Sequence, residues 1–249
     1  MIRINQVKLP VEHTEGMLRK KVQELLNYKG TVDVEIVKRS LDARKKPQLF
    51  YVYMVDVTIP EEEERKVLKR CHNNQIQKIE PVKYEFPVKH YEGTERPVIV
   101  GMGPAGLFCG YVLAKAGFRP ILLERGKCVE ERSRDVEAFW ETGRLNTESN
   151  VQFGEGGAGT FSDGKLNTLI KDKYGRNKEV LRIFVKHGAQ EEILYDYKPH
   201  IGTDILKEIV RSMREKILAL GGEVRFGTKV TDLLIEDGRM KGLVLNGNL

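Results

Sequence analysis

With 249 residues, of which 40% are hydrophobic and 31% charged, the chain is long enough for one large globular domain or two smaller ones. Its 42 Lys and Arg against 36 Asp and Glu give a net charge of +6, a mildly basic balance that suits anionic ligands. Three scattered cysteines argue against a disulfide framework or paired zinc ligands, and the lack of a long apolar run or secretory signal predicts a cytoplasmic protein without a membrane partner.

The first 90 residues predict a small α+β domain. Alternating and β-branched stretches predict strands at 2–9, 31–39, 48–59 and 78–85, and helical spacing predicts helices at 15–28 and 61–71. The polar SLDARKKP segment, which ends at Pro47, predicts the loop of a hairpin between the second and third strands. The order βαββαβ is typical of a ferredoxin-like unit. Residues 91–96, in a polar stretch between Pro87 and Pro97, predict a linker to a second domain at 97–249.

A glycine-rich turn lies near the start of the second domain. Residues 97–126 (PVIVGMGPAGLFCGYVLAKAGFRPILLERG) predict a buried strand at 98–100, a helix to about Ala116 and a second strand at 120–123. In a Rossmann unit the first glycine allows the tight turn, the second leaves room for a diphosphate, and the third lets the helix pack on the strand. Unpaired N–H groups at the helix start favour the anion. The predicted cofactor-binding residues of this turn are Gly101, Gly103, Pro104, Ala105 and Gly106.

An acidic residue completes the motif. Glu124 lies 18 residues after Gly106, at the end of the second strand, where its carboxylate can accept both ribose hydroxyls. A carboxylate there disfavours a 2′-phosphate, so NADP is not expected at this site. We assign Glu124 and the adjacent Arg125 to the cofactor site. The forms GxGPAG and LLERG resemble the nucleotide-binding signature of the glutathione-reductase-like FAD superfamily, which implies FAD as the ligand.

A second glycine-rich segment, NVQFGEGGAGTFSDGKLN, covers residues 150–167 and predicts a loop whose backbone approaches a ligand closely. Together with SLDARKK and GMGPAGLF, this segment resembles a family of predicted bacterial FAD-dependent dehydrogenases, and the likeness covers nearly the whole chain. The resemblance implies that the segment lies along the pyrophosphate and flavin. The residues implied to line the flavin side are Gly156, Gly157, Thr160, Phe161, Ser162, Asp163 and Lys165. From its charge, Lys165 is a candidate to stabilise a reduced, anionic flavin.

The remaining residues predict an amphipathic helix at 204–220 capped by Gly221, a third parallel strand at 223–226, and a hairpin of strands 228–235 and 240–245 turned at Asp237-Gly238. The superfamily resemblance places the backbone of Val230 beside the adenine; an ordinary strand valine is the alternative. Flavoproteins of this type continue into a substrate domain and a later Gly-Asp motif. We therefore expect the Rossmann-type FAD-binding domain, a parallel sheet with helices and a β-hairpin, to be incomplete at its C-terminus.

The function implied is an FAD-dependent oxidoreductase that transfers hydride from NAD(P)H or a small organic substrate. No residue is assigned a catalytic role, although His200, beside Gly202 and ahead of a helix, is the first histidine to test. One alternative is a flavoprotein that modifies RNA, suggested by a basic hairpin. Its cations are Lys38, Arg39, Arg44, Lys45 and Lys46. Another is a non-catalytic protein in which the flavin is structural and the first domain is a docking module.

Overall fold

The structure is a computed structural model, and it describes residues 1–71, 73–88, 90–166, 168, 170 and 172–247. The chain divides into two compact units. Unit 1 comprises Met1–Tyr84, Asn167–Leu181 and Glu191–Pro199, and unit 2 comprises Glu85–Leu166, Arg182–Gln190 and His200–Leu249. The chain is mixed α/β, and its described residues form one parallel sheet and two antiparallel sheets. The domain limits predicted from the sequence stay a prediction.

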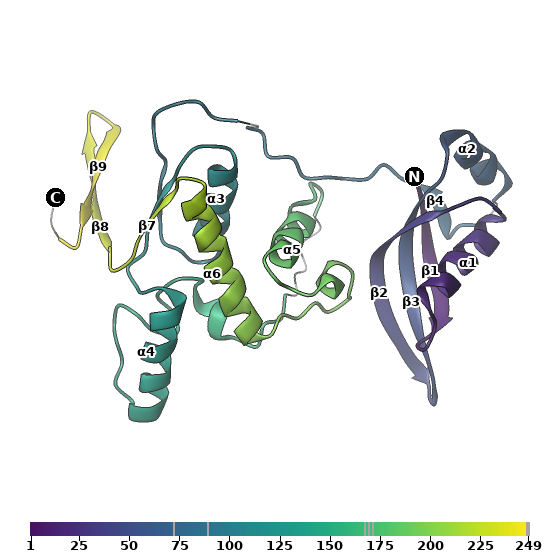
Figure 1. The fold of residues 1–249 in the computed structure, drawn as a ribbon, viewed down its shortest axis with the longest axis horizontal. Coiled ribbons are helices and arrows are strands. Elements are labelled where there is room, and N and C mark those ends of the chain that lie inside the picture. The colour runs from purple at the N-terminus through teal and green to yellow at the C-terminus, as the bar shows by residue number, and fades with distance from the viewer. Residues whose placement is uncertain (72, 89, 167, 169, 171, 248–249) are drawn as a thin grey trace. The chain divides into compact units, whose positions relative to one another are not determined.

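Unit 1 contains a four-stranded sheet of order β2-β3-β1-β4 in which neighbouring strands are antiparallel. Its first elements in chain order are β1 (Ile2–Pro10), α1 (Glu15–Leu26), β2 (Asp33–Lys45), β3 (Gln48–Thr58), α2 (Glu61–Arg70) and β4 (Ile76–Lys78) (Figure 1). The element order βαββαβ is the one predicted. A short 3₁₀ helix, η2 (Glu191–Leu194), also belongs to this unit.

Alternation in the strands and helical spacing in α1 produce the core of unit 1. Val55 and Val57 on β3 are fully buried, as is Val22 of α1, while the intervening strand residues point to the opposite face. Helix α1 ends where Asn27 adopts a left-handed conformation, with φ of 45°. These are the patterns from which the sequence predicted the elements.

Two predictions for this unit are wrong in detail. The segment expected as a hairpin loop continues β2 to Lys45, because Leu41 and Asp42 pair with Tyr51 and Phe50 across the hairpin. The last strand is β4 at residues 76–78 rather than 78–85. The ladder ends soon after Ile79, whose N–H donates to Met1 O, because Pro81 has no N–H to continue it.

Unit 2 contains a parallel sheet of order β5-β6-β7 and a separate hairpin. Its strands are β5 (Val98–Val100), β6 (Ile121–Leu123), β7 (Glu223–Arg225), β8 (Val230–Glu236) and β9 (Arg239–Leu245). Its helices are α3 (Pro104–Lys115), α4 (Val129–Thr142), α6 (Thr203–Ala219) and the 3₁₀ helix η1 (Ala158–Phe161), and α5 (Arg176–Lys186) spans the division between the units.

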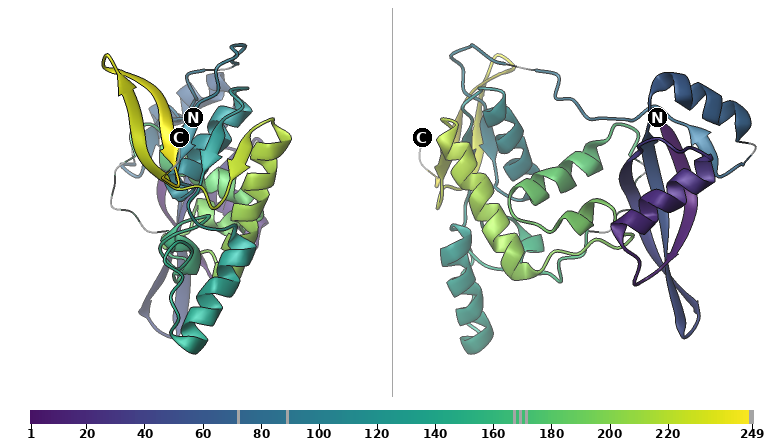
Figure 2. Two further views of the ribbon diagram at one scale, coloured as in Figure 1. Left: turned by 90° about the vertical axis from the view of Figure 1, so that its left-hand side faces the viewer. Right: turned by 45° about the vertical axis from the view of Figure 1, so that its right-hand side comes forward.

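Helices α3 and α6 pack together and lie beside each other in both views of Figure 2. Leu107 and Tyr111 of α3 are buried, as are Ile209 and Met213 of α6. The predicted helices at 104–116 and 204–220, the third parallel strand and the hairpin are confirmed. The hairpin turns at Asp237-Gly238, both with positive φ, as a two-residue turn of this kind requires.

The prediction of a buried first strand is wrong. Val98 and Val100 are 47% and 58% exposed, and β5 lies at the edge of the parallel sheet, where it has a strand neighbour on one side only. Helix α4 is not among the predicted elements. None of the helices in the described part of the chain is both long and apolar enough to cross a membrane.

Candidate functional site

Among the residues that the structure describes, none provides a partner for several backbone donors of the turn between β5 and α3. Gly101 has φ of +88°, and its N–H donates to Leu123 O at 2.7 Å, which directs the chain from the sheet edge into the helix. Gly103 is the N-cap of α3, and no side chain caps the helix. The first N–H groups of a helix have no intrahelical acceptor, so this end of α3 presents donors and the positive end of the dipole.

Two glycines of the turn have different surroundings. A Cβ added at Gly106 would lie 2.0 Å from Gly101 O, so close packing of the helix on the turn requires glycine there. A Cβ added at Gly103 would meet no heavy atom within 4 Å. Pro104 and Ala105 are exposed. The predicted residues of this turn therefore lie together, and the space beside Gly103 is not filled by neighbouring side chains.

Glu124 lies at the end of β6 and is only 4% exposed. Its Oε2 accepts the N–H of Met102 at 2.7 Å, and its Oε1 accepts the N–H of Gly126 at 2.8 Å. A carboxylate offers about four acceptor positions, so each oxygen keeps capacity for a further donor. Glu124 thus faces the glycine turn, as the motif predicts, and also stabilises the turn's backbone.

The two predicted glycine-rich segments meet. The N–H of Gly156 donates to Met102 O at 2.9 Å, and a Cβ added at Gly157 would lie 2.8 Å from Cδ of Pro104. Gly156 and Gly157 have φ of +83° and +68°, values that favour glycine. The second segment therefore lies directly against the start of α3.

A buried arginine that sequence patterns did not single out supports the second segment. Arg132 of α4 is 0% exposed. Its guanidinium donates to four carbonyl oxygens, those of Asn150, Val151, Glu155 and Gly157, over 2.6–2.9 Å. Burial lowers the pKa of Arg132 to about 10, which leaves it charged at neutral pH.

Glu155, between two glycines of this segment, is 0% exposed and also escaped sequence reasoning. Its Oε2 accepts the N–H of Val129 at 2.7 Å and pairs with Nη1 of Arg214 at 2.8 Å. Burial raises the pKa of Glu155 to about 7, an effect that outweighs the lowering by its hydrogen bond and ion pair. Arg214 also pairs with Glu130 at 2.6 Å. A charged residue inside a glycine run was the only signal in the sequence.

Of the residues implied to line the flavin side, Gly156 and Gly157 precede η1 and the others lie on it or after it. Thr160 is fully buried, and Phe161 is half-buried with the guanidinium of Arg132 4.7 Å from its ring centre. Ser162, Asp163 and Lys165 are exposed, and Lys165 Nζ pairs with Asp163 Oδ2 at 2.7 Å.

His200 lies near this exposed group, because Lys165 and His200 form an isolated antiparallel bridge. The N–H of Ile201 donates to Gly164 O at 2.9 Å, which holds the two backbone segments together. The structure therefore brings the first histidine candidate beside Lys165, although 35 residues separate them in the chain.

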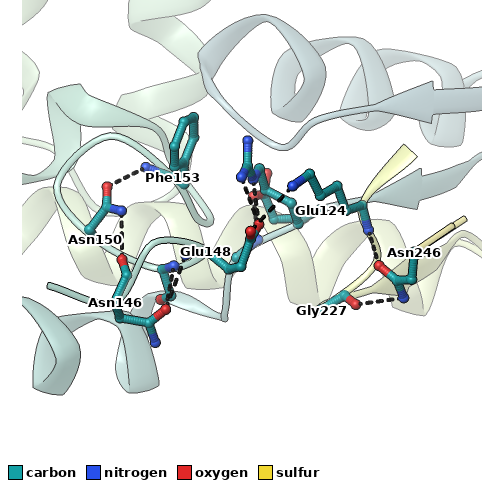
Figure 3. A network of polar contacts seen from close by, with 11 residues as sticks. Glu124, Asn146, Glu148, Asn150, Phe153, Gly227 and Asn246 are labelled. Atoms are coloured by element: carbon teal, nitrogen blue, oxygen red, sulfur yellow. Dashed lines mark hydrogen bonds and ion pairs between the residues drawn. The ribbon is translucent and has the colours of Figure 1, made fainter. Parts of the chain in front are cut away.

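A cleft of about 280 Å³ lies at the carboxyl ends of β5 and β6. It is lined by Val100, Gly101, Gly103, Leu123, Glu124, Arg125, Gln152, Phe153, Gly154, Gly157, Thr228, Lys229 and Val230. Six of these are predicted cofactor residues: Gly101, Gly103, Glu124, Arg125, Gly157 and Val230. The guanidinium of Arg125 lies 3.9 Å from the ring centre of Phe153. Figure 3 shows a network of polar contacts that includes Glu124, Glu148 and Asn246. Sequence reasoning assigned no role to Phe153, although it lies in the second glycine-rich segment, or to Lys229, which lies in no motif.

The basic hairpin of unit 1 is partly neutralised. Arg39 forms a bidentate pair with Asp196, at 2.7 and 3.0 Å, and Arg44 forms one with Asp42, at 2.8 and 2.9 Å. Carboxylates that already bind these guanidinium groups lower the attraction of the hairpin for phosphates. The RNA alternative stays a prediction, and this charge balance does not favour it.

The structure thus defines a mixed α/β protein with a glycine-lined cleft at one edge of a parallel sheet. A family described as a domain of unknown function (DUF8436) matches residues 1–58. An uncharacterised protein of Clostridium beijerinckii is 45% identical over 252 residues, which cover 99% of this chain and 46% of that protein. The chain therefore spans about half the length of the curated relative it matches.

Two solved structures are similar in part. THI4 of Thermovibrio ammonificans is 24% identical with a TM-score of 0.37, over 61% of this chain and 47% of that chain. L-Amino acid deaminase of Proteus myxofaciens, solved in complex with anthranilate, is 12% identical with a TM-score of 0.28, over 68% of this chain and 45% of that chain. At these TM-scores neither likeness carries an argument about function.

Proposed function

We propose that this chain binds FAD in the cleft beside α3 and forms the cofactor-binding part of a flavin-dependent oxidoreductase. The observation that best supports the proposal is the empty space beside Gly103. An uncapped helix start, a second glycine segment and a buried carboxylate all border that space. A diphosphate needs close backbone approach and oriented N–H donors, and this arrangement offers both.

The parts of FAD are assigned by the chemistry of the residues present. The pyrophosphate lies against the turn at Gly101–Gly106 and against Gly157. The carboxylate of Glu124 accepts the adenosine ribose hydroxyls with its remaining lone pairs. Val230, which lines the cleft, lies toward the adenine.

The flavin lies toward η1 and the residues that follow it. The assigned residues are Gly156, Thr160, Phe161, Ser162, Asp163 and Lys165. When bound, FAD supplies the hydride chemistry, and the protein orients and tunes it. Lys165, which lies beside His200 and whose Nζ pairs with Asp163, is the proposed source of positive charge near a reduced flavin. NAD(P)H or a small organic molecule is the proposed hydride donor.

Gly103→Val tests the site without disturbing the fold. The backbone at Gly103, with φ of −67° and ψ of −177°, is extended and accepts valine, and nearby space is free. We expect the wild-type chain to take up FAD and show flavin absorption. The valine side chain obstructs the diphosphate, so FAD affinity should fall at least about tenfold, while the urea midpoint stays unchanged. Gly16→Val, at an exposed position of α1 in unit 1, is the matched control and should bind FAD normally.

The proposal would be contradicted if the wild-type chain did not take up FAD. It would also be contradicted if wild type and Gly103→Val bound FAD with equal affinity. Anaerobic addition of NADH or NADPH to the flavin-loaded protein extends the same experiment. Loss of the oxidised-flavin absorption supports the oxidoreductase, whereas a flavin that resists NADH, NADPH and dithionite supports the structural alternative.

A further inference from the structure

One end of the cleft carries two cations and one buried carboxylate. Arg125, Lys229 and Glu124 all line it, and a second carboxylate, that of Glu148, lies behind the two cations without lining the cleft itself. The four side chains sum to zero charge. Without Glu148 the same group would carry a net charge of +1 and would attract a phosphate group.

Glu148 binds each cation with a different oxygen. Arg125 donates from Nη2 and Nε to Oε2 at 2.7 and 2.9 Å, and Lys229 Nζ lies 3.2 Å from Oε1. The hydrogen bond from Arg125 is the main cause that lowers the pKa of Glu148, so this carboxylate is ionised at neutral pH. The Nε–Nη2 edge of the Arg125 guanidinium, which could otherwise bind a phosphate, is thus already occupied, and so is one donor position of Lys229.

The local backbone holds Glu148 in this position (Figure 3). Asn146 Oδ1 accepts the N–H of Glu148 at 3.0 Å, and Asn150 Nδ2 donates to Asn146 O at 2.7 Å. On the other side, Asn246 Oδ1 accepts the N–H of Lys229 at 2.9 Å. Figure 3 shows Glu148 at the centre of the network, with Asn146 and Asn150 on one side and Asn246 on the other. The ion pair of Glu148 with Lys229 therefore joins two backbone segments, and each segment is held in place by its own asparagine.

We infer that Glu148 is a positioning residue that makes the adenosine end of the cleft selective for nucleotides with a free ribose 2′-hydroxyl and against those with a 2′-phosphate. The inference rests on the proposed function, since it requires an adenine nucleotide in the cleft. Arginine is the residue that accommodates a 2′-phosphate in dinucleotide sites. Arg125 follows Glu124 directly in the chain. Glu148 binds both Arg125 and Lys229 and so reduces their combined positive charge.

The test compares ADP with adenosine 2′,5′-bisphosphate, two soluble probes of the same end of a dinucleotide, by calorimetry at low ionic strength. Wild type should prefer ADP. Glu148→Gln keeps the side-chain shape and removes the charge, so affinity for the bisphosphate should rise about fivefold, while affinity for ADP changes less than about twofold. The gain should shrink in high salt, because Arg125, Glu148 and Lys229 are partly accessible to solvent.

Two further variants separate charge from shape. Glu148→Asp keeps the charge and should keep the preference for ADP. Glu141→Gln, an exposed acid on α4 with the same change in net charge, should leave the selectivity ratio unchanged.

An unchanged ratio in Glu148→Gln, or an equal gain in Glu141→Gln, overturns the inference. If wild type binds FAD and ADP while the ratio does not move, only the inference fails. If wild type binds neither FAD nor ADP, the proposed function fails and the inference fails with it.

Discussion

The two glycine-rich segments of unit 2 border the same cleft but are supported in different ways. The turn at 101–106 lies between a strand and a helix, and its backbone bonds run to the neighbouring strand and within α3, with one to the Glu124 side chain and one to Gly156. The segment at 154–157 has no regular structure, and a single buried guanidinium binds the carbonyls of Glu155 and Gly157.

The difference shows what an irregular loop requires in a protein interior. Regular elements satisfy most of their own backbone groups, so small residues and the single carboxylate of Glu124 shape the first turn. The second segment buries carbonyls that no strand or helix can pair, and Arg132 supplies the donors. Burying that cation costs desolvation energy, which makes its partners essential. Three substitutions test this comparison.

The largest effect is expected for Arg132→Met. This change removes the hydrogen-bond donors of four carbonyls and also removes a positive charge that interacts with the carboxylate of Glu155. The free energy of unfolding should fall by about 3–5 kcal/mol in urea denaturation. Arg134→Met, at an exposed position on the same helix, should change it by less than about 0.5 kcal/mol. Equal stability of the two variants would mean that the guanidinium does not support the segment.

A pH-dependent effect is expected at Glu155, whose pKa rises from 4.5 to about 7 on folding. The folded protein keeps a proton that the unfolded chain releases, so the stabilising contribution is present below about pH 4.5 and is lost as the pH rises to 7. In Glu155→Gln the neutral amide replaces the carboxyl group, so there is no proton to release in this pH range. Relative to wild type, its free energy of unfolding should therefore gain about 3 kcal/mol between pH 4.5 and 7 in urea titrations. Glu137→Gln, an exposed acid on α4, should show no such trend, and a flat difference for Glu155→Gln would exclude the raised pKa.

The smallest of the three effects is expected in the first turn. Gly106→Ala places a methyl group 2.0 Å from Gly101 O, which should lower the free energy of unfolding by about 2 kcal/mol. Gly202→Ala, at a position with φ of −57° and no heavy atom within 4 Å of the new Cβ, should leave it unchanged. Thermal unfolding of both variants measures the difference, and equal midpoints would show that the turn relaxes without cost.

Elements with strong periodicity were predictable from the sequence. The apolar spacing of α6, the alternation of β3 and the Asp237-Gly238 turn each depend on local residue order, and the structure confirms them. Helix α4 has few buried positions among many charged ones, so its apolar pattern is weak. The exposure of Val98 and Val100 depends on which strand lies at the edge of the sheet, and β-branched residues alone do not reveal that.

The candidate site also contains some residues that could be predicted from the sequence and others that could not. The glycine turn and Glu124 are recognisable because their spacing follows from one strand, one turn and one helix. Arg132 lies in a charged helix and Glu148 in a polar segment without a motif, and only the folded chain shows what they bind. Their roles arise from contacts across 18 or more residues, which local patterns do not encode.

Met102 has a consequence for how any molecule would associate with the cleft. This residue is fully buried; its N–H donates to Glu124, and its carbonyl accepts the N–H of Gly156. The backbone of Met102 thereby connects the turn to the end of β6 and to the second glycine-rich segment, so this side of the cleft is preorganised. An incoming molecule would lose little free energy to ordering this backbone, so affinity should depend mainly on how well it replaces the hydration of the exposed amides.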